Sequence, residues 1–276
     1  MTATTAHIAQ TSVGEPIRPN DGVVPLLEEI EKGRLKVVGT GFYITRFGLV
    51  MTARHVFEDL CTDLDSTGRV ARPCYVLHNG EDSFHLRPIR RYSLLDPQDI
   101  AVAQADNFME RVPQRPLINL MARLSTEPPV PGSPVVTYAY PENEILDFTQ
   151  QDTTNTIVAN YYDGRVIGHV DSGPYMPYPH FRTSIEIRSG ASGGPVFCGG
   201  RIIGISCRGW DFAGGEQEDD PLSSIIPISA ALTLRIEELM IPPNSWEFSQ
   251  IPENARRTAH TLAQLAEYGH INLNQQ

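Results

Sequence analysis

Ser192 lies in a glycine-rich segment that could expose a nucleophile. The segment Ser189–Pro195 reads Ser-Gly-Ala-Ser-Gly-Gly-Pro. Glycines on both sides of a serine let the backbone bend tightly and leave main-chain N–H groups free to point at one place. Acyl transfer needs that geometry, because the nucleophile and the oxyanion donors must converge on one carbonyl. A glycine-rich turn with a bystander serine is the alternative interpretation.

A serine nucleophile needs a general base, and His55 is the best candidate in the sequence. The apolar strand predicted over Leu49–Thr52 presents His55 at its end, where a short helical stretch opens, so the ring is expected at an edge of the fold. Most of the other histidines fall in predicted hairpins or in the tails, where solvated side chains are expected: His7, His78, His85, His169, His180, His260 and His270.

Asp99 is the candidate for the carboxylate that orients the base. It begins the segment Asp99–Gln104, in which a carboxylate enters an apolar strand. An aspartate at a strand end is also a common turn former, so this segment alone leaves both roles open.

The elements that must position these residues are predicted to be short antiparallel strands. Three dipeptides that supply the positive φ of two-residue hairpins lie between apolar runs: Asn79-Gly80, Asp163-Gly164 and Gly199-Gly200. The last of them would pair Cys198 with Arg201. No helix-length pattern separates these runs, so βαβ units are not expected.

Helical spacing is convincing only near the C-terminal end. One helix is predicted from Ser229 to Met240, stopped by two prolines, and a second from about Glu253 to Tyr268 with Gly269 at its C′ position. The second helix carries a broad face of small apolar residues. This face would pack against a barrel or dock another chain.

Four segments, taken in order, resemble the trypsin-like (chymotrypsin-fold) serine proteases, and are closest to bacterial members that lack a zymogen form. They are Gly39-Thr40-Gly41-Phe42, Thr52-Ala53-Arg54-His55, Asp99-Ile100-Ala101-Val102 and Gly190–Pro195. The resemblance covers roughly residues 23–240. It implies an all-β fold of two six-stranded antiparallel β-barrels, with the triad in the cleft between them and a C-terminal helix.

The expected organisation of the 276 residues follows from this resemblance. We expect a flexible N-terminal segment over 1–20 and a first barrel over 21–122 that contains His55 and Asp99. A second barrel and its C-terminal helix would occupy 123–241 and contain Ser192. Residues 242–276 would form an extension that is helical.

The resemblance also implies the role of each site residue. Ser192 would be the nucleophile, and His55 the general base and then the general acid for the leaving amine. Asp99 would fix the tautomer of His55 and stabilise its imidazolium. The main-chain N–H groups of Gly190 and Ser192 would form the oxyanion hole. The expected activity is that of a serine endopeptidase that works through an acyl-enzyme, with no cofactor and no metal.

Three positions depart from the pattern of the family. Ala191 replaces the aspartate that many secreted relatives pair with a new N-terminus, so activation by N-terminal insertion is not expected. Val56 replaces a cysteine that often follows the catalytic histidine. Arg54 replaces a small residue, and the sequence assigns it no effect.

The specificity pocket is much less defined. By position, Glu186 would lie at the base of the primary pocket and favour Lys or Arg before the scissile bond; alternatively, it faces water between Ile185 and Ile187. Ser206 and Arg208 would belong to the edge strand that binds an extended substrate. Arg208 would lie at the pocket mouth and Ser223 at its wall. Because these signals conflict, the preferred residue stays open.

Composition restricts the partners. The chain has 22 Lys plus Arg against 33 Asp plus Glu, a net charge of -11, which argues against nucleic acid or an anionic membrane. No leader peptide and no run of 18 apolar residues is visible, so a cytoplasmic location is expected, with the four cysteines reduced. The expected partners are a peptide or protein substrate and a regulatory protein; the oligomeric state is open.

Two other functions compete with an active protease. Gly190–Gly194 also fits the nucleophile elbow of an α/β-hydrolase esterase, but the hairpin predicted after Pro195 contradicts the strand–turn–helix which that fold requires. An inactive chymotrypsin-fold domain could instead serve as a binding module. For an active enzyme, the family resemblance also suggests one restricted substrate in a bacterial stress or defence system.

Overall fold

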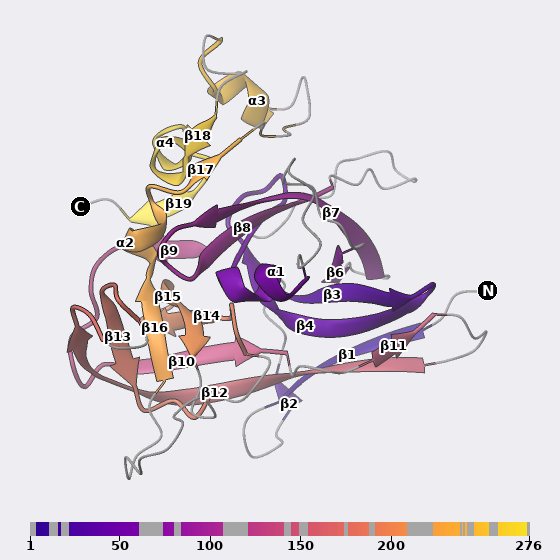
Figure 1. The fold of residues 1–276 in the computed structure, drawn as a ribbon, viewed down its shortest axis with the longest axis horizontal. Coiled ribbons are helices and arrows are strands. Elements are labelled where there is room, and N and C mark those ends of the chain that lie inside the picture. Colours follow the sequence, from indigo (N-terminus) through magenta and orange to yellow (C-terminus); the bar gives the residue numbers. More distant parts are fainter. Residues whose placement is uncertain are drawn as a thin grey trace.

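The computed structural model describes residues 4–10, 16–17, 22–60, 74–79, 84–106, 121–140, 145–148, 154–173, 176–187, 191–208, 223–237, 239, 241, 246–253 and 259–274. Within these residues, most strands belong to two antiparallel barrels that lie side by side, with the C-terminal segments beyond them (Figure 1). The predicted pair of six-stranded barrels is confirmed.

The first barrel has the strand order β4-β3-β6-β7-β8-β5 and is closed by the pairing of β4 with β5. Its strands are β3 (Val23–Glu31), β4 (Arg34–Tyr43), β5 (Leu49–Thr52), β6 (Cys74–Asn79), β7 (Phe84–Leu95) and β8 (Ile100–Ala105). All residues of β5 and β8 are buried, because one face points into the barrel and the other is covered by neighbouring elements.

The second barrel has the order β10-β14-β15-β16-β13-β12 and is closed by the pairing of β10 with β12. Its strands are β10 (Pro134–Ala139), β12 (Thr154–Val170), β13 (His180–Thr183), β14 (Pro195–Cys198), β15 (Arg201–Arg208) and β16 (Ser223–Pro227). A separate cluster of buried apolar side chains, among them Val135, Phe181 and Val196, fills its interior.

The three predicted hairpins have different outcomes. Gly199-Gly200 forms the turn between β14 and β15, with φ values of 56° and 76° and with Cys198 opposite Arg201, as predicted. β6 and β7 do form a hairpin, but Asn79 pairs with Phe84, so the connection is residues 80–83, which lie outside the described residues. The turn predicted at Asp163-Gly164 is wrong, because both residues lie within β12.

A glycine is required at position 164 because another segment of the chain packs closely against it. A Cβ at this position would lie 2.8 Å from the main-chain nitrogen of Ile185 and 2.9 Å from its side chain. The glycine therefore lets the chain around Ile185 approach β12, and it supplies no turn.

The predicted C-terminal helices are shorter than expected. α2 covers only Ile228–Ala231, and the next residues include β17 (Arg235–Ile236), which pairs with β18 (His260–Thr261). Main-chain pairing to β18 replaces helical hydrogen bonds there, and the β-branched Ile236 has low helix propensity. α4 covers Leu262–Glu267 because Thr261 and Gln264 form a capping box that starts the helix late.

Several further elements lie outside the two six-stranded barrels. β1 (Thr4–Gln10), in the segment expected to be flexible, pairs in parallel with the first half of β12, and β2 (Pro16–Ile17) pairs with β1. β11 (Ile145–Asp147) pairs with β4. In the extension, α3 covers Trp246–Gln250, and β19 (Asn272–Asn274) lies parallel to β9 (Arg123–Ser125). In the described part of the chain, no helix has the length and apolar character to cross a membrane.

Candidate active site

His55 and Asp99 are brought together by the pairing of β5 with β8. The two strands are antiparallel, with Thr52 opposite Ala101, so the end of β5 lies beside the start of β8. α1 (Arg54–Leu60) follows β5 after Ala53, which makes His55 its second residue. Asp99 directly precedes β8. His55 and Asp99 therefore lie at one corner of the first barrel.

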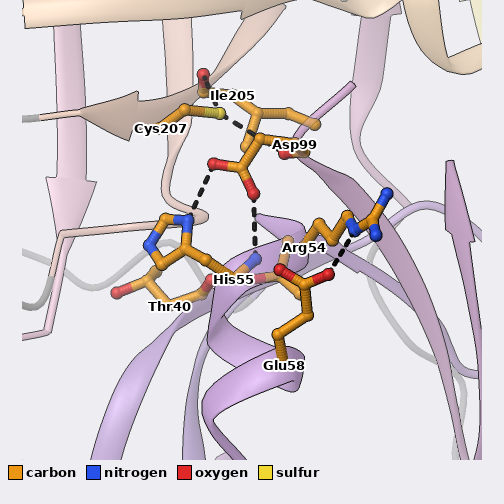
Figure 2. Close-up of polar contacts among 8 residues, drawn as sticks. Thr40, Arg54, His55, Glu58, Asp99, Ile205 and Cys207 are labelled. Carbon is orange, nitrogen blue, oxygen red and sulfur yellow. Dashed lines mark hydrogen bonds and ion pairs between the residues drawn. The ribbon is translucent and has the colours of Figure 1, made fainter. Parts of the chain in front are cut away.

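The carboxylate of Asp99 holds His55 at two points (Figure 2). Its Oδ1 accepts a hydrogen bond from the main-chain N of His55 at 2.9 Å, and its Oδ2 lies 2.7 Å from the ring Nδ1. A carboxylate cannot donate, so Nδ1 carries the proton of the neutral ring and Nε2 is the basic nitrogen. This arrangement fixes both the position and the tautomer of the imidazole.

Cys207 of β15 contacts Asp99 from the second barrel. Its Sγ lies 3.5 Å from the carbonyl oxygens of Asp99 and Ile205. Asp99 therefore lies between Cys207 and His55 (Figure 2). Burial, and then the negative charge of Asp99, raise the pKa of the Cys207 thiol well above its ordinary value. The thiol stays protonated and can donate to these carbonyls.

Thr40 of β4 links the two barrels through hydrogen bonds to the main chain of Ser192, the predicted nucleophile, and of Tyr140. Its main-chain N donates to the carbonyl of Ser192 at 3.0 Å, and its Oγ1 accepts from the N of Tyr140 at 2.9 Å. Its carbonyl accepts from Thr52 Oγ1 at 2.7 Å. Because Thr40 is fully buried, these bonds are shielded from competition with water.

The segment that carries Ser192 packs tightly on the segment that ends in His55. Gly193 has a φ of 83°, and a Cβ there would overlap Thr52 Oγ1 and the carbonyl of Thr40. A Cβ on Gly39 would lie 2.8 Å from Val56 and 3.3 Å from the carbonyl of Ser192. These close approaches place half-buried Ser192 against the Thr52–Val56 stretch.

The second barrel holds the same segment from the other side. Gly193 N donates to the carbonyl of Ser206 at 2.7 Å, and Ser206 N donates to the carbonyl of Gly194 at 2.9 Å. Gly190, the other predicted oxyanion donor, lies outside the described residues, so its N–H is not placed.

The four residues predicted for the specificity pocket occupy different environments. Glu186 is exposed between buried Ile185 and Ile187, which is the arrangement expected of a side chain that faces solvent. Ser206 is fully buried, and its hydroxyl makes no hydrogen bond within the described residues. Arg208 ends β15, and its side chain lies outside the described residues.

Ser223 has a structural role that the sequence did not reveal. Its hydroxyl donates to the carbonyl of Ile185 at 2.6 Å and accepts from the N of Ile187 at 3.4 Å. It thereby holds the chain on both sides of Glu186.

The sequence alone assigns no role to Thr40 or Cys207. Thr40 lies in the Gly-Thr-Gly-Phe motif, but only the fold shows that its neighbour is Ser192. Cys207 stands two residues after buried Ile205, so strand alternation predicts that both share a face. That signal predicts a buried thiol but not its contact with Asp99.

Comparison with known families identifies the class of protein. The model of the trypsin-like peptidase domain matches residues 39–205, which is more than half of the chain. The chain belongs to this family. The matched range runs from β4 to β15 and contains His55, Asp99 and Ser192.

Solved structures of low sequence identity share the fold. Deg5 is 22% identical, with a TM-score of 0.52 over 76% of this chain and 84% of the other. The MamO protease domain from Magnetospirillum magneticum is 15% identical, with a TM-score of 0.51 over 76% of this chain and 93% of the other. No curated protein matches the sequence at a significant level.

Proposed function

We propose that the protein is a serine endopeptidase with Ser192 as nucleophile, His55 as general base and acid, and Asp99 as the orienting carboxylate. The observation that carries the proposal is the two-point attachment of His55 to Asp99, at 2.9 Å and 2.7 Å. An aspartate that only formed a solvent-facing turn would not be expected to contact both the main chain and the ring of His55. The packing of the Ser192 segment on Thr52–Val56 supports the third member.

The reaction follows from these positions. Nε2 of His55 takes the hydroxyl proton as Ser192 Oγ bonds to the scissile carbonyl carbon, and the carbonyl oxygen becomes an oxyanion. The N–H groups of Gly190 and Ser192 would stabilise that charge. Asp99 stabilises the imidazolium, which then protonates the leaving amine as the C–N bond breaks. Water, activated by the same nitrogen, releases the acyl group and restores Ser192.

An inactive binding module is the second candidate, because membership of the family does not by itself establish turnover. The intact set of His55, Asp99 and Ser192 favours the enzyme. The preferred residue before the scissile bond stays open. A single restricted substrate, a bacterial stress or defence setting, a regulatory partner and the cytoplasmic location stay predictions.

Turnover of a peptide library tests the proposal. The wild-type protein should create new N-termini, and sequencing them reads the residue preference directly. Ser192→Ala should create none. Asp99→Asn should lower kcat on the order of 10⁴-fold, because an amide no longer enforces the productive tautomer of His55. Circular dichroism serves as the folding control, and a folded wild type that cleaves nothing would instead support the binding module.

A further inference from the structure

Arg54 departs from the family pattern, and the proposed mechanism leaves it without a role. We propose that Arg54 is a positioning residue: it clamps α1, which carries His55, to the β7–β8 turn, which leads into Asp99. This proposal rests on the proposed protease function, since the clamp would act on catalysis through the His55–Asp99 pair.

The guanidinium of Arg54 bridges the two segments. Its Nε lies 2.6 Å from Glu58 Oε1, one helical turn further along α1 (Figure 2). Its Nη1 lies 2.8 Å from Asp96 Oδ1, in the turn that follows β7. Because both nitrogens belong to one planar group, the two carboxylates fix its orientation. Glu58 therefore orients the Arg54 side chain, and Asp96 binds the same guanidinium from the β7–β8 turn.

α1 needs such an anchor. A helix of seven residues has little stability of its own and depends on its tertiary contacts. One contact is the stacking of Phe57 on Tyr92 of β7, with ring centroids 5.2 Å apart and planes inclined by 5°. At the end of the helix that bears His55, the main-chain N of His55 donates to Asp99, and Arg54 adds a further attachment to the β7–β8 turn.

The expected effect is small but measurable. Arg54, Glu58 and Asp96 have exposed side-chain fractions of 26%, 47% and 86%, so water and salt weaken the ion pairs. An exposed pair of this kind shifts an equilibrium about two- to fivefold. Such a shift would hardly affect folding. It would change the rate if the productive His55–Asp99 geometry depends on it.

The effect of the Arg54 charge must be distinguished from the effect of its hydrogen-bond geometry. Its hydrogen bond to Glu58 raises the pKa of the guanidinium further, so the positive charge is permanent in the working range of pH. Removing it would leave the carboxylates of Glu58 and Asp96 without this cation. Arg54→Lys keeps the positive charge but loses the planar guanidinium group. Asp96→Ala keeps Arg54 and removes only its carboxylate partner in the β7–β8 turn.

The test compares Arg54→Ala and Asp96→Ala with Arg90→Ala. Arg90 is a matched control, because it pairs with Asp106 at 2.7 Å from the same strand, β7, toward the far end of β8. Two readouts are needed: kcat and KM on a peptide substrate, and the proton resonance of His55 Nδ1 in nitrogen-15-labelled protein. A proton held between Nδ1 and Asp99 gives a strongly downfield signal, and this signal does not require turnover.

We expect Arg54→Ala and Asp96→Ala to lower kcat about two- to fivefold at unchanged KM, and to weaken or shift the His55 signal. The double variant should be no worse than the worse single one, Arg54→Lys should recover part of the loss, and Arg90→Ala should match wild type. If Arg54→Ala fails to fold, Asp96→Ala carries the test.

A loss of kcat without any change in the His55 signal would overturn the positioning role, as would variants of Arg54 and Asp96 that match Arg90→Ala. If the wild type cleaves no peptide, the proposed function fails separately. The His55 signal of the unreacted protein then still decides the clamp: an unchanged signal in Asp96→Ala overturns it, and a weakened one supports it.

Discussion

Asp99 accepts from the main chain and from the ring of one residue, His55, and this double contact gives the imidazole a defined orientation. Both residues were identified from single-residue signals, a polar residue at the end or start of an apolar strand. Cys207 and Thr40 could not be found in this way, because their roles depend on contacts between the barrels. Local patterns predict candidate site residues better than they predict the residues that hold them in place.

A second polar pair lies inside the first barrel. Arg87 is fully buried and donates to the hydroxyl of Tyr43 at 2.9 Å, with its guanidinium 5.2 Å from the Tyr43 ring centroid. Burial raises the pKa of Tyr43 to about 12, although the charge of Arg87 opposes this shift. The folded protein therefore keeps this proton at pH values where the unfolded chain releases it.

Stability should consequently fall in alkali. Tyr43 contributes its full stabilisation below pH 10 and loses it as the pH rises toward about 12. The expected slope from this residue is about 1.4 kcal/mol per pH unit. Urea unfolding between pH 9 and 12 measures it. The other tyrosines titrate in both proteins, so the readout is the difference from Tyr43→Phe, which should lose this part of the slope; equal slopes would contradict the assignment.

At the scale of elements, the loop that carries Ser192 depends on a glycine for two reasons. Gly193 has a positive φ, and it also has no room for a Cβ against Thr52 and Thr40. Gly200, in the β14–β15 turn, has a similar φ of 76° but nothing within 4 Å of a Cβ. Comparing substitutions at the two positions therefore separates the cost of a left-handed backbone conformation from the cost of steric overlap.

Gly193→Ala should destabilise the protein more than Gly200→Ala. Gly200→Ala should cost about 1 kcal/mol, from the left-handed conformation alone. Gly193→Ala adds an overlap with the first barrel and should displace Ser192, with loss of peptide cleavage. Denaturant unfolding and activity assays on both variants measure this. Equal stabilities with full activity would show that the Ser192 loop does not pack as described.

The sequence predicts an element correctly where its local signals agree with the tertiary structure. The Gly199-Gly200 hairpin has both glycines at positive φ and the expected register. Asp163-Gly164 has the same local signal, but Gly164 makes room for Ile185 within a strand. The helix predicted from Ser229 ends early because β17 pairs with β18, which lies much later in the sequence. Long-range pairing is not visible in a local pattern.

At the scale of the whole molecule, the C-terminal extension is an integral part of the core. Leu262 and Leu265 of α4 are buried in the cluster that includes the first-barrel core. His270 packs edge-on against Phe47, at 5.5 Å between ring centroids. β19 continues the second-barrel sheet through β9. Of the two roles open from the sequence, these contacts favour packing of α4 on the body of the protein.

Removing residues 244–276 should therefore destabilise the barrels. Leu265→Ala alone should cost about 2–5 kcal/mol, and the truncation, which removes several buried residues, should cost more. Glu267→Ala, an exposed position on the same helix, is the matched control and should be near neutral. Thermal unfolding compares the three. A truncated protein as stable as the full chain would contradict the packing role of the extension.

The most direct test of the central claim is covalent labelling of Ser192 by a fluorophosphonate. An activated serine displaces fluoride and gains the phosphonyl group, which intact mass and peptide mapping locate. The proposed triad predicts one adduct, on Ser192, in the wild type and in Ser229→Ala, an exposed-serine control. His55→Ala should label far more slowly and Ser192→Ala not at all. A folded wild type without an adduct, or an adduct that persists in Ser192→Ala, would contradict the account.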